Sequence, residues 1–341
     1  MARPDVRRAP APCDRAIGGD GLPLGRRELA RRPRAAQWKW LAQGLALVVV
    51  IVLWGAYLAR SWEQLAGYQW RIASGLLGLA ALGWAAYFLM LGVGWVFLVR
   101  RAGHQMPLGG GLRAWACSMP ARYVPGNVWH VVGRLYLGSR LGARIETLLA
   151  TSAVEQVLTV LGAVLVGLAL GLSDRAAAWR PGLALVAGLG LIAIHPKVLG
   201  AALGLAGRLL GKRPEPVRLS YRDLALALGW YVLANLVSGV AFWLLVLSLG
   251  GAGPQHLLRL IGAYALAYAV GYLSFLTPAG LGAREAALGA RLGGLGASPV
   301  AVAASLLARA ASALGEALGV AALGLISARS IVGPKGRPDS R

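Results

Sequence analysis

The residues best placed to do chemistry surround a helix break, Arg122 to Val131, inside a long apolar region. Pro125 lacks a backbone N–H and Gly126 permits dihedral angles that other residues avoid, so the pair predicts an interruption of helical structure. Asn127 is a typical N-cap for the helix that would follow, and the free N–H groups of a helix N-terminus suit a phosphate. This first break therefore predicts an anion site.

Two arginines, Arg122 and Arg134, flank the first break and strengthen that prediction. The planar guanidinium binds phosphate oxygens through two parallel hydrogen bonds. The residues predicted to bind a headgroup phosphate here are Arg122, Tyr123, Asn127 and Arg134. The alternative is that both arginines anchor the chain at the membrane interface, where cations meet anionic lipid.

A second break, Leu276 to Glu285, recurs near the other end of the chain. Pro278 fits the first position of a helix, while Gly280 and Gly282 allow close approach to the backbone. Arg284 and Glu285 follow directly, so a cation again lies beside an interrupted helix, and Arg284 joins the predicted phosphate-binding residues. The alternative is that both charges pair with groups on neighbouring helices.

Three further ionisable residues, Glu155, Arg309 and Glu316, lie inside long apolar runs. Such groups are costly at membrane depth unless they are paired or wet, and they often mark a functional cavity. Arg309 and Glu316 are seven residues apart and share a helix face. We expect Arg309 to help neutralise a phosphate, and Glu155, Glu285 and Glu316 to position the arginines or to bind a cationic headgroup. A structural ion-pair network is the alternative.

Motifs for other chemistry are missing from the sequence. The stretch from Gly207 to Arg213 resembles a P-loop, but three residues rather than four separate its glycines, and no Ser or Thr follows the lysine. The two cysteines and four histidines lack metal-ligand spacing. We therefore expect no cofactor, no metal and no catalytic activity, and lipid movement that is passive or ion-coupled.

Composition points to a membrane protein. Hydrophobic residues make up 57% of the 341 residues, above the roughly 45–50% of soluble domains. Only 14% of residues are charged, yet the net charge is +22. These values agree if the cations flank membrane spans and meet anionic lipid. No soluble basic domain is present to bind nucleic acid, so that class is excluded.

The apolar segments predict an all-α, polytopic transmembrane protein with about eight crossings. Around the first break, Leu108–Ala121 and Val124–Leu137 are each too short to cross a core of about 30 Å, which predicts a re-entrant hairpin. A pair of interfacial amphipathic helices is the alternative. The predicted spans are Trp40–Leu58, Ile72–Val99, Thr147–Leu172, the short Gly182–Ile194, Asp223–Leu249, Leu257–Leu276 and Ser298–Ile326.

Both halves of the chain share the order span, span, broken element, span, in which Pro278–Leu295 is the second broken element. Paired interrupted helices at corresponding positions are the best sequence pointer to a transporter binding site. The cation-rich N-terminal tail and 196–222 loop predict a cytoplasmic N-terminus. We expect a disordered basic tail over 1–37, a membrane domain over 38–328 and a short basic tail over 329–341.

Five stretches of the chain match a known family in the same order; they are Arg122–Trp129 with Gly133-Arg134, Ala153–Glu155, His195–Lys197, Leu219–Leu224 and Pro278–Ala287. On these stretches the chain resembles the lysylphosphatidylglycerol synthase transmembrane-region family, the flippase half of the multiple-peptide-resistance proteins, over roughly residues 40–328. That family's pattern often has a lysine at position 127 and a glycine at position 279, where this chain has Asn127 and Ala279.

The resemblance implies a flippase-like domain that moves a phospholipid or a polyprenyl-phosphate-linked lipid between leaflets of the bacterial inner membrane. The family's aminoacyl-transfer domain does not fit into 341 residues, so we expect that this chain does not make lysyl-lipid itself. Two rival functions remain open. One is an accessory subunit that partners a glycosyltransferase or a lipid-synthesis enzyme, and the other is a membrane-embedded lipid-modifying transferase.

Overall fold

The computed structural model describes residues 72–123, 129–170, 180–195, 219–250, 253–274, 283–292 and 299–331, with a few single residues in 59–66 and 197–201. The regular structure of these residues is helical, which confirms the predicted all-α fold. The helices are α3 (Ser74–Arg101), α4 (Leu108–Ser118), the 3-10 turn η1 (Met119–Tyr123), α5 (Trp129–Ser139), α6 (Ile145–Leu170), α7 (Arg180–Ala193), α9 (Tyr221–Ser248), the 3-10 turn η3 (Pro254–His256), α10 (Leu257–Leu273), α11 (Ala283–Leu292) and α12 (Pro299–Ile331).

Five helices of the described part are long and apolar enough to cross a membrane. They are α3, α6, α9, the η3–α10 segment and the stretch Ala303–Leu323 of α12. Each matches a predicted span to within a few residues at its ends. Helix α7, with 14 residues, is the predicted short segment. The predicted span Trp40–Leu58 lies outside the described residues, so the total of about eight crossings stays a prediction.

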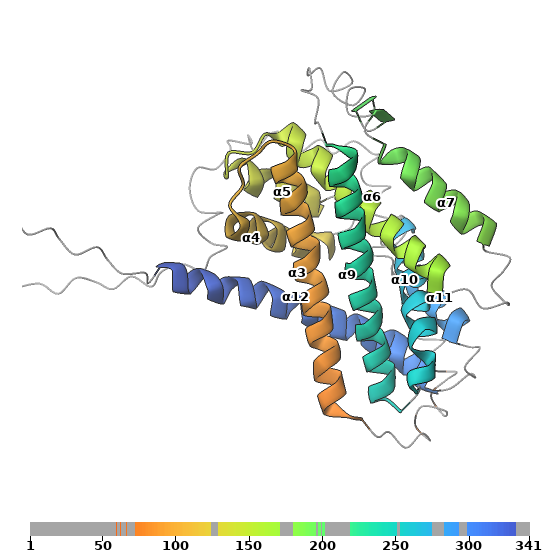
Figure 1. Cartoon of the computed structure of the whole chain (residues 1–341). Coiled ribbons are helices and arrows are strands. Elements are labelled where there is room, and N and C mark those ends of the chain that lie inside the picture. Colours follow the sequence, from red (N-terminus) through yellow and green to blue (C-terminus); the bar gives the residue numbers. More distant parts are fainter. Residues whose placement is uncertain are drawn as a thin grey trace, which may run out of the picture.

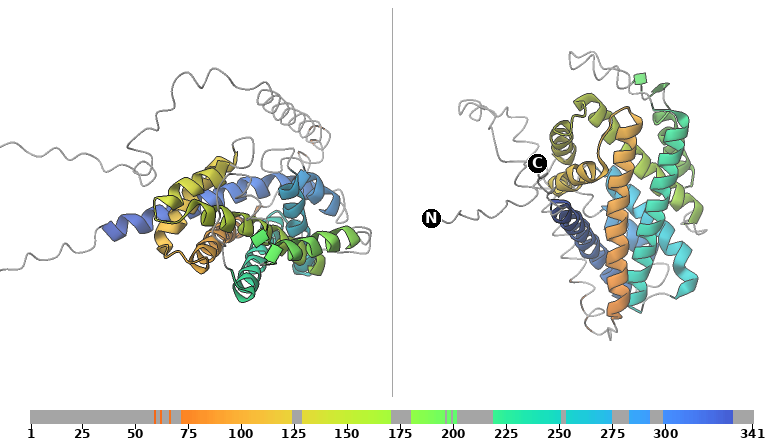
Figure 2. Two further views of the ribbon diagram at one scale, coloured as in Figure 1. Left: turned by 90° about the horizontal axis from the view of Figure 1, so that it is seen from above. Right: turned by 60° about the vertical axis from the view of Figure 1, so that its left-hand side comes forward.

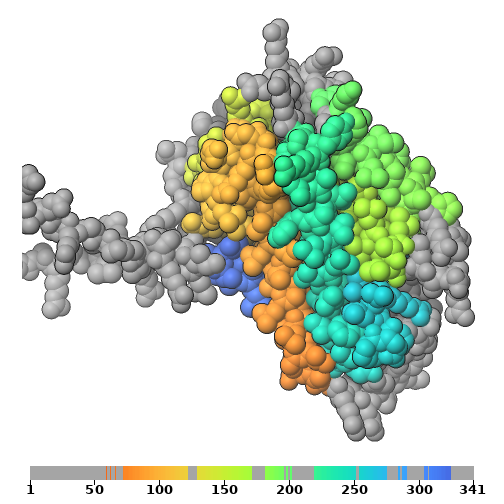
Figure 3. Space-filling model, in the orientation of Figure 1, coloured from red at the N-terminus to blue at the C-terminus, as the bar shows by residue number. Residues whose placement is uncertain are grey.

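The long helices α3 and α9 run side by side through the molecule, with α6 and α10 packed behind them (Figure 1). Helix α12 runs across α3 rather than along it, as both orientations in Figure 2 show. In the space-filling view, α3, α9 and α10 form one continuous face (Figure 3). Helices α3 and α9 carry large exposed apolar side chains, as lipid-facing helices do; these are Leu79, Leu82, Leu226, Leu233 and Val240.

Helices α4 and α5 form the predicted hairpin of short helices. Each has 11 residues, a length of about 16 Å, which is roughly half of what a bilayer core requires. They pack against each other and against α3 and α6 near one end of the long helices (Figure 1). Helix α11, with 10 residues, lies within the predicted second broken element, Pro278–Leu295, and packs on α10 and α12.

The buried side chains gather in two clusters. The first centres on Trp95, Trp115, Leu158 and Tyr231, where α3, α4, α6 and α9 meet. The second centres on aromatic and alanine side chains of α3, α9, α10 and α12, such as Trp84, Phe242, Tyr264, Ala304 and Ala308. Trp95 and Trp115 of the first cluster pack on Arg134 of α5, and Tyr264 of the second contacts Arg284 of α11.

Local sequence sets the helix ends near these clusters. Ser220 caps α9, since its hydroxyl accepts from the Asp223 N–H at 3.1 Å and the Asp223 carboxylate accepts from the Ser220 N–H at 3.3 Å. The turn after α3 needs Gly103, whose φ of 96° lies in the left-handed region. The α5–α6 turn uses Gly142 in the same way, with a φ of 84°.

Candidate functional site

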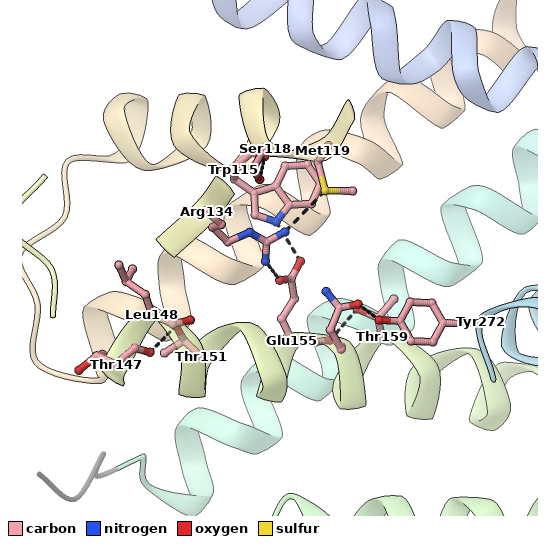
Figure 4. A network of polar contacts seen from close by, with 11 residues as sticks. Trp115, Ser118, Met119, Arg134, Thr147, Leu148, Thr151, Glu155, Thr159 and Tyr272 are labelled. Carbon is pink, nitrogen blue, oxygen red and sulfur yellow. Dashed lines mark hydrogen bonds and ion pairs between the residues drawn. The ribbon is translucent and has the colours of Figure 1, made fainter. Parts of the chain in front are cut away.

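A buried ion pair lies where the α4–α5 hairpin meets α6. Arg134 of α5 is 0% exposed and donates to Glu155 of α6, which is 2% exposed. The second carboxylate oxygen, Oε1, accepts from Trp115 Nε1 of α4 at 2.9 Å. Figure 4 shows Arg134 and Glu155 pointing toward each other beside the Trp115 ring. For Glu155 the sequence left a polar cavity and a structural ion-pair network open, and the structure shows Glu155 paired with Arg134.

The guanidinium of Arg134 is also held by its surroundings. Its carbon lies 5.2 Å from the centre of the Trp95 ring and 5.3 Å from that of Trp115. A cation over a tryptophan face is attracted by the ring quadrupole, and desolvation strengthens this attraction. Nη2 approaches Met119 Sδ at 3.6 Å, as Figure 4 shows. Glu155 thus balances the charge of Arg134, and aromatic rings pack around it.

Two glycines of α5 face the neighbouring helices α4 and α6 near this pair. A Cβ at Gly138 would lie 2.8 Å from Leu148 Cδ2, so a larger residue there would require the Leu148 side chain of α6 to shift. A Cβ at Gly133 would lie 3.4 Å from Ser118 Cβ of α4. Within α6, the carbonyl of Glu155 accepts from Thr159 Oγ1 at 2.7 Å.

A second arginine, Arg284, lies on α11 against a tyrosine face of α10. Its guanidinium carbon is 4.7 Å from the centre of the Tyr264 ring and 5.9 Å from that of Tyr268. Arg284 Nη2 donates to the Tyr264 hydroxyl, which also accepts from Trp84 Nε1 at 2.8 Å. Gly271 permits the contact, because a Cβ there would lie 2.8 Å from Arg284 Cβ.

The two arginines differ in what balances their charge. Arg134 is paired with a carboxylate, whereas among the described residues Arg284 makes its contacts with aromatic rings and one neutral hydroxyl. Glu316 of α12 is near enough to act electrostatically on Tyr264, as Arg284 does. The second site therefore holds a partly buried cation whose partner Tyr264 also feels the Glu316 carboxylate.

The structure places the other predicted residues less closely. Arg309 and Glu316 are half-buried on α12, and each has interaction partners. Arg122 and Tyr123 belong to η1 and Glu285 to α11, but their side chains lie outside the described part. The remaining predicted residues lie outside the described ranges altogether; these are Pro125, Gly126, Asn127, Pro278, Gly280 and Gly282. Their proposed roles stay predictions.

Sequence reasoning missed the tyrosines that hold Arg284. Tyr264, Tyr268 and Tyr272 recur every four residues, so they fall on one face of α10. Their rings form a series, since Tyr268 and Tyr272 stack with centroids 6.2 Å apart. This spacing of tyrosines inside an apolar helix could have predicted an aromatic face on α10. Trp95 and Trp115 gave none, because tryptophans are common in apolar segments of this chain.

The described residues offer little for a metal, since no three His, Cys, Asp or Glu side chains among them gather closely enough to hold one. In a comparison with known families, the model of the lysylphosphatidylglycerol synthase TM region matches residues 40–319. A search of curated proteins found no match. The chain belongs to the lysylphosphatidylglycerol synthase TM-region family and is a multi-pass membrane protein of lipid-related function.

Proposed function

We propose that this member of the family binds the phosphate of a lipid headgroup at Arg284 and moves that lipid between membrane leaflets. One observation carries the proposal: among the described residues, a partly buried guanidinium on a short helix, inside an apolar bundle, contacts aromatic rings and a neutral hydroxyl. A charged group at this depth is a functional-site hypothesis by default. A guanidinium matches the geometry of phosphate oxygens.

The neighbouring hydroxyl supports an anion at this point. The Tyr264 oxygen accepts hydrogen bonds from both Arg284 and Trp84. A phenol has one proton to donate and two lone pairs, so two accepted bonds leave the proton available to a ligand oxygen. Arg284 and Tyr264 would then offer two kinds of donor to the same phosphate. Charge-assisted hydrogen bonds to phosphate are roughly twice as strong as neutral ones. Arg284 would therefore exchange its hydrogen bond to the Tyr264 hydroxyl for one to the phosphate.

Other predicted residues take supporting roles in this proposal. Arg122, Tyr123, Asn127 and Arg309 are further phosphate ligands along the path, and Glu285 and Glu316 position the arginines or meet a cationic headgroup. Direct phosphate binding by Arg134 stays a prediction; with Glu155 balancing its charge, Arg134 here holds the hairpin in place. The lipid is a phospholipid or a polyprenyl-phosphate-linked lipid of the bacterial inner membrane, and the N-terminus faces the cytoplasm.

A leaflet-resolved assay tests the function. The full chain is reconstituted in vesicles containing fluorescent phosphatidylglycerol or, separately, a fluorescent polyprenyl phosphate, and loss of outer-leaflet signal to dithionite is followed. We expect Arg284→Gln to slow the transfer of the transported lipid by about 10- to 100-fold, the equivalent of one charge-assisted hydrogen bond. The matched control is Arg113→Gln, which removes an exposed arginine that bonds its own helix at Gly109 O, 3.1 Å away.

Two results would count against the proposal. If the Arg284→Gln variant moved lipid at the wild-type rate, Arg284 would not bind the headgroup during transfer. Wild-type vesicles that move neither lipid faster than protein-free vesicles would favour the accessory role. In that case, a glycosyltransferase or lipid-synthesis enzyme that purifies with the chain would identify the partner.

A further inference from the structure

Two neighbouring residues of α6 contact the two halves of the molecule. Glu155 binds Arg134 and Trp115 of the α4–α5 hairpin. The next residue, Gln156, accepts a hydrogen bond from the hydroxyl of Tyr272 on α10. Figure 4 shows Tyr272 approaching α6 from a different side than Arg134 does. Consecutive helical residues point about 100° apart, so one turn of α6 serves both neighbours.

The contact with Tyr272 continues to Arg284. Tyr272 stacks on Tyr268 with an interplanar angle of 28°, and the Arg284 guanidinium lies over the Tyr268 ring. Tyr268 is also packed edge-on against Tyr87 of α3, with centroids 6.3 Å apart. A continuous series of contacts therefore joins the buried ion pair on one side of α6 to the arginine of the second site.

We propose that Gln156 and Tyr272 are positioning residues that couple the α4–α5 hairpin to α11. Glu155 is held by two donors and is almost fully buried, so α6 cannot rotate there without losing both bonds. A rotation that broke them would also withdraw the Gln156 acceptor from Tyr272. The α4–α5 hairpin and α11 therefore change position together, and the neighbouring residues Glu155 and Gln156 of α6 transmit the change. Coupling of this kind is reciprocal between the two sites.

Hydrogen exchange measured by mass spectrometry tests the coupling in the full chain without any lipid. The peptides of interest cover α5 (Trp129–Ser139) and α11 (Ala283–Leu292). Tyr272→Phe removes one hydroxyl and keeps the ring, and Gln156→Met removes the acceptor at similar volume. Each variant should speed amide exchange in both peptides by about two- to tenfold, the range that corresponds to one hydrogen bond.

The distant peptide separates coupling from local damage. Tyr272 lies on α10, so a purely structural role would change exchange in α10 and α11 and leave α5 at the wild-type rate. The double variant should match either single variant, since both remove the same bond. Tyr221→Phe is the matched control: it removes a hydroxyl bonded to His195 at 2.6 Å, outside this series of contacts. It should leave both peptides unchanged.

The reciprocal experiment uses Glu155→Gln, which weakens the ion pair and should speed exchange in α11. Unchanged exchange in α5 for both Tyr272→Phe and Gln156→Met would overturn the inference, as would additive effects in the double variant. Because no lipid is used, the coupling can fail while Arg284 still transports lipid. Conversely, if the protein proved not to transport lipid, the exchange experiment would still decide whether α5 and α11 are coupled.

Discussion

Removing Arg134 should destabilise the protein more than any other single arginine change in the described part. Arg134→Met strands Glu155 in a site that is 2% exposed, with Trp115 Nε1 as the remaining donor among the ion pair's contacts. Breaking a buried ion pair from one side costs about 3–5 kcal/mol. The lost stacking on Trp95 and Trp115 adds up to about 2 kcal/mol, part of which methionine recovers by packing against the rings.

The companion variants separate the pair from its individual charges. Replacing both residues, Arg134→Met with Glu155→Leu, leaves no buried charge, and such replacements are often neutral or stabilising. We expect the double variant to recover most of the loss. Arg134→Lys keeps the charge but loses the planar fork and its ring contacts, so about 2 kcal/mol of the loss should remain.

Thermal unfolding in detergent, followed by intrinsic fluorescence and checked by size-exclusion chromatography, measures these differences. With about 2–4 °C per kcal/mol for a domain of this size, Arg134→Met should lower the midpoint by roughly 6–20 °C. The reasoning would be refuted if Arg134→Met unfolded within a degree of the wild type. A double variant less stable than either single one would equally show that the pair's charges are not what holds the hairpin.

The remaining predictions concern helix packing, capping and topology. Gly315→Ala should destabilise the protein by about 1–3 kcal/mol, because the new Cβ would lie 2.9 Å from the backbone N of Ala85. The control Gly229→Ala, whose Cβ would have nothing within 4 Å, should leave the stability unchanged. Comparing the thermal unfolding midpoints of the two variants tests this. Ser220→Ala removes the α9 cap and should cost about 0.5–2 kcal/mol by the same measurement, and no change would show that the capping box is dispensable. A cysteine at Lys212 should resist membrane-impermeant maleimide in intact cells, and its labelling from outside would reverse the predicted orientation.

Helix type and location followed from hydropathy, because apolar runs long enough to span a membrane have few other uses. The short α4 and α5 were predicted for the same reason, since Arg122 and the Pro125-Gly126 pair divide an otherwise continuous apolar region. The paired state of Glu155 was one of two alternatives. Its partner could not be chosen from the sequence, because the choice depends on how α5 packs on α6.

Packing also explains why the tyrosine face of α10 went unpredicted. Tyr264 contributes to the second cluster as an apolar ring and to the Arg284 site through its hydroxyl. A periodic aromatic stripe predicts burial, but the identity of the neighbour that meets its polar ends depends on tertiary structure. The glycines that permit the contacts, Gly138 and Gly271, likewise look like ordinary membrane-helix glycines until the facing helix is known.

The different partners of Arg134 and Arg284 bear on which arginine would bind the ligand of the proposed function. A phosphate that approached Arg134 would have to displace the Glu155 carboxylate, leave that charge unpaired in the interior, and separate the guanidinium from two tryptophan rings. At Arg284 it would displace one neutral hydroxyl and could keep the tyrosine stacking, while gaining charge-assisted bonds. The first exchange strands a buried charge and the second strands none. We therefore expect the carboxylate on α6 to disfavour an anionic headgroup at Arg134, which leaves the α10–α11 side as the site in the proposed function.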